Sequence, residues 1–150
     1  MSFETDLKSV ADTEAFGARL ARALPAVRLL YLRGPLGVGK TTLVRGLLRE
    51  LGYADSVKSP TFTLVEPYTF QGWTLYHFDL YRLNDPGELE FIGIRDYVQS
   101  GVCVVEWPER GAPVLPLPDV DVMILPNNGE RRVRLVAHTP QGEALLRGLK

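Results

Sequence analysis

The stretch Gly34-Pro35-Leu36-Gly37-Val38-Gly39-Lys40-Thr41 decides how this chain folds, and Thr42 continues it. The apolar run 27–32 precedes it, and residues 43–48 follow it at helical spacing. A glycine-rich loop between a strand and a helix is typical of a P-loop, where backbone N–H groups wrap a phosphate at a helix N-terminus. The sequence therefore predicts that these residues bind a nucleotide.

Two residues of this loop have predicted chemical roles. Lys40 is expected to reach the β- and γ-phosphates, and the Thr41 hydroxyl is expected to bind Mg²⁺. The alternative is a glycine turn that ends in Lys-Thr by chance, which we expect about once in a few hundred sequences. The flanking strand and helix make a chance match rarer still.

Length and composition limit the other classes of protein. With 150 residues and 45% hydrophobic content, we expect one domain spanning 1–150, close to the minimum for a P-loop sheet. A net charge of −1 predicts no surface for direct nucleic-acid binding, so RNA would be met through partner proteins. Cys103, the single cysteine, excludes an internal disulfide and fits a reducing compartment. Without a signal peptide or a membrane-length apolar run, the chain is expected to be cytoplasmic and away from membranes.

Hydrophobic patterning predicts an α/β fold, a P-loop NTPase with a mixed sheet, a parallel core, antiparallel hairpins and flanking helices. Residues 101–105 are continuously apolar, which is typical of a buried parallel strand beside the P-loop strand. One hairpin is expected to pair 61–70 with 73–80, its strands exposed on one side, and another to pair 120–125 with 131–138. The other expected elements are an edge strand at 3–9 and helices at 12–24, 43–51, 88–91, 94–99 and 142–149.

Two carboxylates compete for the second half of the magnesium site, which a P-loop takes from a neighbouring strand end. Glu106 follows four apolar residues of the strand expected to be buried, so it fits the metal-ligand role better. Asp79 ends a strand of the first hairpin, and we expect it near the γ-phosphate, where it orients or deprotonates a nucleophile. For either residue the alternative is a solvated strand-end carboxylate.

The segment Ser59-Pro60-Thr61-Phe62-Thr63 follows the P-loop helix, where GTPase-like proteins carry a switch loop ordered by the γ-phosphate. Ser59, Thr61 and Thr63 are the candidate residues of such a loop, and a threonine hydroxyl there would complete the magnesium shell. A simple Ser-Pro turn entering a strand explains the same residues equally well.

Several side chains have less specific interpretations. His77 and His138 lack metal-ligand spacing and are expected to be structural, and Cys103 is expected to be a small buried hydrophobe. Aromatic residues crowd the first hairpin, and such rings are typical of a core and also of a partner surface. They are Tyr68, Phe70, Trp73 and Tyr81.

Five blocks of the chain together resemble the TsaE (YjeE) family, the small bacterial P-loop ATPases of tRNA threonylcarbamoyladenosine synthesis. They occur in the family's order and cover most of residues 10–110. They are Gly-Pro-Leu-Gly-Val-Gly-Lys-Thr-Thr at 34–42, Lys-Ser-Pro-Thr-Phe-Thr-Leu-Val-Glu-Pro-Tyr at 58–68, His-Phe-Asp-Leu-Tyr-Arg-Leu at 77–83, Glu-Leu-Glu-Phe-Ile-Gly-Ile-Arg-Asp-Tyr at 88–97 and Val-Glu-Trp-Pro-Glu at 105–109.

The resemblance implies roles for residues at these matching positions. Lys40, Thr41 and Thr42 would bind phosphates and magnesium, Glu106 would complete the metal site, and Asp79 would be needed for hydrolysis. Thr61 would lie in a switch-like loop.

The resemblance also implies where the base and the partners bind. The base would be contacted near Val10–Thr13, including Thr13, and near Asn128 and Gly129. ATP and Mg²⁺ would be the cofactors, and TsaD and TsaB the protein partners. The ATPase would sustain their transferase, and would meet tRNA only through that complex.

Two other functions of the protein are compatible with the same P-loop. In a small-molecule kinase, Arg82, Arg95 and Arg110 would clamp the transferred phosphoryl group, although little chain is left for an acceptor domain. A GTPase-like switch is disfavoured because no Asn-Lys-x-Asp segment is present, so adenine is the expected base.

Overall fold

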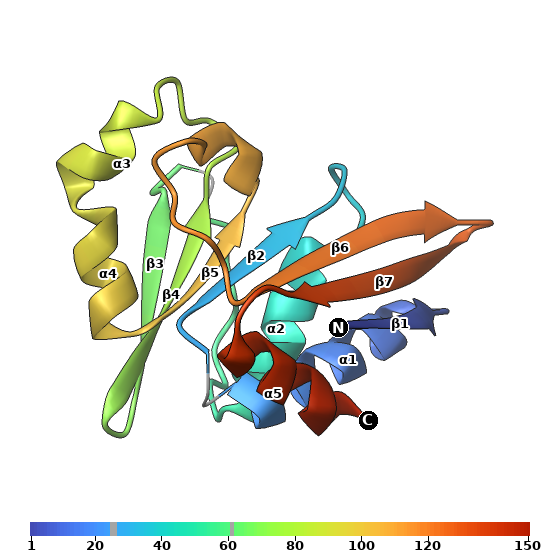
Figure 1. Ribbon diagram of the computed structural model, residues 1–150. Helices are drawn as coiled ribbons and strands as arrows, with labels where there is room; N and C mark the ends of the chain where they lie inside the picture. Colours follow the sequence, from blue (N-terminus) through green and yellow to red (C-terminus); the bar gives the residue numbers. More distant parts are fainter. Residues whose placement is uncertain (25–26, 61) are drawn as a thin grey trace.

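The computed structural model describes residues 1–24, 27–60 and 62–150, which form a seven-stranded mixed sheet flanked by helices (Figure 1). The strand order is β1-β7-β6-β2-β5-β4-β3. The strands are β1 (Ser2–Leu7), β2 (Leu29–Arg33), β3 (Val65–Phe70), β4 (Trp73–Asp79), β5 (Val102–Glu106), β6 (Val120–Asn127) and β7 (Glu130–Ala137). The helices are α1 (Val10–Ala23), α2 (Lys40–Glu50), α3 (Gly87–Ile92), α4 (Ile94–Ser100), α5 (Pro140–Leu149) and the short 3-10 helix η2 (Pro108–Gly111).

The strand β2 lies at the centre, because its apolar residues are buried on both faces of the sheet. It pairs in parallel with β5 on one side, as the apolar run 101–105 predicted, and with β6 on the other. The parallel pairing with β6 was not predicted, since a hairpin pattern identifies only the antiparallel partner, here β7. Ligands bind outside the carboxyl ends of parallel strands in such sheets.

The strand β4 corrects one prediction from the sequence. Alternation had suggested a hairpin exposed on one side, but β4 is an interior strand, antiparallel to β3 and parallel to β5. Leu75 and Phe78 are both fully buried and belong to different apolar clusters, so both faces of β4 are covered. The strand β3 is also shorter than expected, because it begins at Val65.

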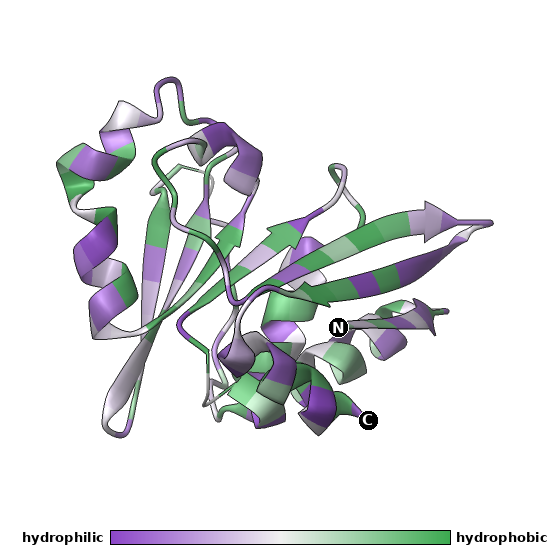
Figure 2. Ribbon diagram, viewed as in Figure 1, coloured by the Kyte–Doolittle hydropathy of each residue, from purple (hydrophilic) through white to green (hydrophobic). Residues whose placement is uncertain are grey.

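Helices cover the two faces of the sheet unequally (Figure 1). The larger apolar cluster joins α1, α2 and α5 to the sheet, and the smaller one joins α3 and α4 to β2, β4 and β5. Figure 2 shows hydrophilic residues interrupting β1 and β7, at the edge of the sheet opposite β3. No helix among the described residues has the length and apolar character that crossing a bilayer requires.

The helices α1 and α2 touch through glycine. A Cβ added at Gly46 would lie 2.1 Å from the Glu14 carbonyl oxygen, and one at Gly17 would lie 2.2 Å from that of Leu43. Any side chain at either position would therefore push the helices apart. This contact holds the start of α1 beside the start of α2, where the P-loop ends.

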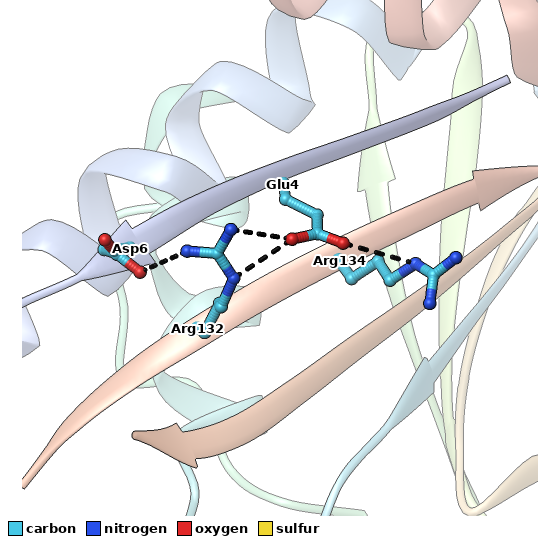
Figure 3. Close-up of polar contacts among 4 residues, drawn as sticks. All are labelled: Glu4, Asp6, Arg132 and Arg134. Carbon is cyan, nitrogen blue, oxygen red and sulfur yellow. Dashed lines mark hydrogen bonds and ion pairs between the residues drawn. The ribbon is translucent and has the colours of Figure 1, made fainter. Parts of the chain in front are cut away.

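The edge strand β1 is joined to its neighbour β7 by exposed ion pairs (Figure 3). Arg132 on β7 lies 2.7 Å from Glu4 and 2.6 Å from Asp6 of β1, and Arg134 lies 3.5 Å from Glu4. The β1–β7 register sets Glu4 opposite Arg134 and Asp6 opposite Arg132. Opposite charges across a strand pair stabilise that register modestly.

Candidate nucleotide-binding site

A cavity of about 500 Å³ opens at the carboxyl ends of β2, β4 and β5. Parallel strands bring their carboxyl ends to one edge, so residues from distant parts of the chain meet there. Its lining combines P-loop residues with both candidate carboxylates and several aromatic and basic side chains: Leu36, Gly37, Gly39, Lys40, Thr41, Thr42, Ser59, Phe62, Asp79, Tyr81, Arg82, Glu106 and Trp107.

The P-loop leads from β2 into α2 through a left-handed turn. Gly39 caps α2 with φ 112° and ψ 20°, a conformation that side chains strongly disfavour, which explains a glycine directly before Lys40. The helix then begins with its free N–H groups at the cavity. Gly34 and Pro35 do not line this cavity, but the Gly34 carbonyl oxygen accepts a hydrogen bond from Lys40.

Lys40 is a buried cation held by two contacts. Its Nζ lies 2.5 Å from the Gly34 oxygen and 3.9 Å from the centre of the Trp107 ring. Burial lowers the pKa of Lys40, and the charges of Glu106, Asp79 and Glu109 oppose that effect. A buried ammonium favours an anion beside it.

Asp79 and Glu106 are neighbours across the parallel β4–β5 pair, directly opposite in register. Both are buried, with 4% and 3% of their surface exposed, and both line the cavity that contains Lys40. Acidic side chains are rarely buried, so two of them in one cavity beside a lysine point to a chemical task.

Asp79 is also connected to the segment predicted to be switch-like. Ser59 donates its hydroxyl to Oδ2 of Asp79 at 3.1 Å, and the Tyr81 N–H donates to Oδ1 at 3.0 Å. Thr63 is exposed and bonds Glu66, so it does not join the cavity lining. Thr61 lies outside the described residues.

Glu106 has a buried partner that the sequence analysis had not paired with it. Nε2 of His77 lies 2.6 Å from Oε2 of Glu106, and the His77 side chain is fully buried. His138 likewise bonds Asp121 at 3.2 Å, but at the surface. A histidine two residues before Asp79 shares its face of the strand, and this spacing was the available signal.

A second, smaller cavity of about 230 Å³ adjoins the first across the P-loop. It brings the start of α1, with the buried Thr13, together with Gly129 of the β6–β7 turn. Asn128 occupies the same turn with φ 51° but does not line this cavity. Both cavities share Gly37, Gly39 and Thr42 in their linings, so they lie side by side along the P-loop.

Arg131 ties this second cavity to the P-loop, a role without a local sequence signal. Its Nε–H donates to the Val38 carbonyl oxygen at 3.0 Å, and Arg131 also lines the cavity. The late hairpin therefore braces the loop that precedes α2.

The aromatic side chains of the first hairpin and its exit pack mainly against other aromatic residues of this chain. Tyr68 is buried and contacts Tyr53 edge-on at 4.8 Å, while Phe70 stacks on Trp73 at 5.0 Å. Tyr81 packs against Trp107 at 5.0 Å beside the cavity. Cys103 is also buried, as expected, and burial raises the pKa of its thiol to about 12, so it is not a thiolate at neutral pH.

The residues present fit a magnesium ion held together with phosphates. Among the described residues, no group of three or more His, Cys, Asp or Glu forms a cage for a metal ion. Mg²⁺ in nucleotide sites needs no such cage, because one or two carboxylates, phosphate oxygens and waters complete its shell. Thr41 and Glu106, which line one cavity with Asp79 beside them, would supply the protein's share of such a shell.

A family model described as threonylcarbamoyl adenosine biosynthesis protein TsaE matches residues 7–134. The chain belongs to the TsaE family. The family expected from the sequence motifs is thereby confirmed, and the match extends beyond the P-loop through β5 into the late hairpin.

Curated relatives and a solved structure agree with this membership. The TsaE protein of Haemophilus influenzae is 46% identical over 137 residues, covering 87% of each chain. The TsaE protein of Synechocystis is 44% identical over 120 residues, covering 77% of this chain and 75% of the relative. The crystal structure of Bacillus subtilis YdiB superposes with a TM-score of 0.82 at 29% identity, covering 99% of this chain and 94% of that one.

Proposed function

We propose that this TsaE-family chain binds and hydrolyses ATP with Mg²⁺ in the cytoplasm, and that this activity supports threonylcarbamoyl modification of tRNA adenosine. One observation carries the proposal: Lys40, Asp79 and Glu106, from three separate segments, are all buried around one cavity at the P-loop. Three buried charges in one cavity suit a triphosphate with its metal, which neutralises them.

In this proposal, the position of each residue in the cavity gives it a separate role toward phosphate, metal or water. Lys40 and the N–H groups at the start of α2 bind phosphate oxygens, while the Thr41 hydroxyl and Glu106 hold the metal. A bound Mg²⁺ supplies charge neutralisation on the β- and γ-phosphates. Asp79, at the adjoining strand end, accepts a hydrogen bond from the attacking water and orients it.

The smaller cavity suits the nucleoside end of ATP. Thr13 and Gly129 both line it, and Gly37 and Gly39 are shared with the phosphate cavity. We propose adenine as the base, since the chain has no Asn-Lys-x-Asp segment for reading guanine.

We further propose that TsaD and TsaB are the partners, and that the chain meets tRNA only through them. Family membership supports this part of the proposal. The test is ATP turnover by the isolated protein, then with both partners, and then with small-molecule acceptors. We expect slow turnover alone and faster turnover with the partners. Unchanged turnover, with phosphate appearing on an acceptor, would replace the proposal with a kinase.

The kinase alternative has limited geometric support. Arg82 lines the phosphate cavity and lies 4.5 Å over the Phe62 ring, and Arg110 lies 5.5 Å over the Tyr81 ring beside it. Arg95 instead lines surface cavities along α4, away from Lys40. The three arginines therefore do not form one clamp.

A further inference from the structure

His77 is a polar side chain in the buried core of the sheet, where its neighbours are mostly apolar. It is fully buried on the interior strand β4, on the same face as Leu75, which is also fully buried. Its Nδ1 atom is buried and has no hydrogen-bond partner among the residues that the structure describes. Leaving a buried polar atom unpaired is unfavourable, so a histidine here needs a compensating role.

The other nitrogen of His77 makes one short contact. Nε2 lies 2.6 Å from Oε2 of Glu106, and no more than 4% of either side chain is exposed. An ionised carboxylate only accepts hydrogen bonds, so the proton in this contact belongs to Nε2. A hydrogen bond to a charged acceptor in a dry environment is among the stronger kinds.

The strand register explains how the contact arises. Glu106 pairs with Asp79 and His77 pairs with Val104, so the Glu106 side chain runs back one pleat toward His77. Oε2 of Glu106 accepts the hydrogen bond from His77, whereas Oε1 has no hydrogen bond or ion pair among the described residues. Glu106 nevertheless lines the phosphate cavity, so Oε1 is the oxygen available to a ligand there.

We propose that His77 is a positioning residue that fixes the Glu106 carboxylate for Mg²⁺. The inference rests on the proposed function, since it assumes that Glu106 serves as a magnesium ligand. His77 donates from beneath the cavity, restricts rotation of the carboxylate and keeps Oε1 directed to the cavity side. Side chains that hydrogen-bond a metal ligand in this way commonly contribute 10–100-fold, in order of magnitude, to metal affinity.

The experiment compares the affinity for a non-hydrolysable ATP analogue with and without Mg²⁺, by calorimetry, in full-length variants. His77→Leu removes the donor while keeping an apolar side chain. We expect it to reduce the strengthening by Mg²⁺ roughly 10–100-fold and to leave metal-free binding nearly unchanged. His77→Gln, whose side-chain amide can donate from a similar position, should restore most of the effect.

Leu75→Ala is the matched control, because it perturbs the same face of β4 without touching Glu106. It should lower thermal stability and leave the magnesium dependence intact. If His77→Leu does not fold, His77→Asn replaces it, since its shorter amide cannot reach Glu106.

Three results would overturn the inference. The first is an unchanged magnesium dependence in folded His77→Leu, or in His77→Asn where that replaces it. The second is an equal loss of magnesium dependence in Leu75→Ala. The third is no recovery of magnesium dependence in His77→Gln. Failure of the wild-type protein to bind the analogue at all would instead contradict the proposed function, so the two failures are distinguishable.

Discussion

Charged side chains are buried in one half of the sheet and exposed in the other. At the carboxyl ends of β2, β4 and β5, Lys40, Asp79 and Glu106 are buried around one cavity. On β1 and β7, Glu4 and Arg132 form ion pairs with 41% and 45% of their side-chain surfaces exposed (Figure 3). Charges of both signs are present in both places, but the side chains are buried only around the cavity.

This difference separates groups that serve the site from groups that hold strands together. Buried charges are costly unless paired, while exposed pairs are screened and contribute little to stability. Among the described residues, the buried polar or charged side chains all lie at the two cavities or beneath them. They are Thr13, Lys40, His77, Asp79 and Glu106.

The largest effect is expected from Lys40→Ala, which should abolish nucleotide binding and therefore turnover. Losing two charge-assisted hydrogen bonds, each about 1.5–3 kcal/mol, weakens binding by roughly 10²–10⁴-fold. Calorimetry with an ATP analogue measures the loss. Arg134→Ala, which removes a cation from the exposed half, should bind like the wild type. Equal losses in both variants would contradict the contrast between the two halves.

Asp79→Ala should separate binding from chemistry. Because Asp79 is assigned to orienting the water, hydrolysis should fall by about 10²–10⁴-fold while affinity for the ATP analogue stays within a few-fold. Single-turnover hydrolysis and calorimetry give the two quantities. A parallel loss of binding and hydrolysis would show that Asp79 belongs to phosphate or metal binding instead.

Gly46→Ala should lower stability and weaken nucleotide binding together. Alanine favours a helix by roughly 1 kcal/mol, but overpacking costs about 1–3 kcal/mol, and a clash at 2.1 Å with backbone should bring the cost to the upper end. Separating α1 from α2 also moves Thr13 away from the P-loop. Thermal denaturation and calorimetry measure both effects.

Gly148→Ala on α5 is the matched control for this variant, because its nearest neighbour would be a side-chain carbon at 3.3 Å. It should change the melting temperature much less and leave nucleotide affinity unchanged. A Gly46→Ala protein with wild-type affinity would show that the α1–α2 contact does not set the nucleoside cavity.

The smallest effect is expected from Arg132→Ala. Its ion pairs with Glu4 and Asp6 are exposed, so the melting temperature should fall less than in Gly46→Ala, and added salt should shrink the difference. Nucleotide binding should not change. Salt-independent destabilisation would indicate that Arg132 acts through packing of its side chain on the strands.

The sequence predicted the features that depend on neighbouring residues. The P-loop is a contiguous motif, and the apolar run 101–105 correctly identified the buried strand beside β2. Asp79 and Glu106 were recognised as strand-end carboxylates, and the structure brings both to the cavity that holds Lys40.

Features that depend on strand register were missed. The alternation of β4 suggested an exposed face because a local pattern does not reveal α2 and α4 on either side of the sheet. The contact between His77 and Glu106 requires the parallel pairing of β4 with β5, which no local pattern contains. Arg131 braces Val38 across more than ninety residues of chain, so its role follows only from the fold.

The stacking of Trp107 on Lys40 gives the protein a natural optical signal. Lys40 Nζ lies 3.9 Å from the indole ring centre, so we expect the emission of that ring to change when an anion draws Lys40 away. The chain has two tryptophans, and Trp73 lies at the opposite end of β4 from Asp79, where it stacks on Phe70. We therefore expect Trp73 to contribute a background, against which the emission of Trp107 would report binding of an anion at the P-loop in the unlabelled protein.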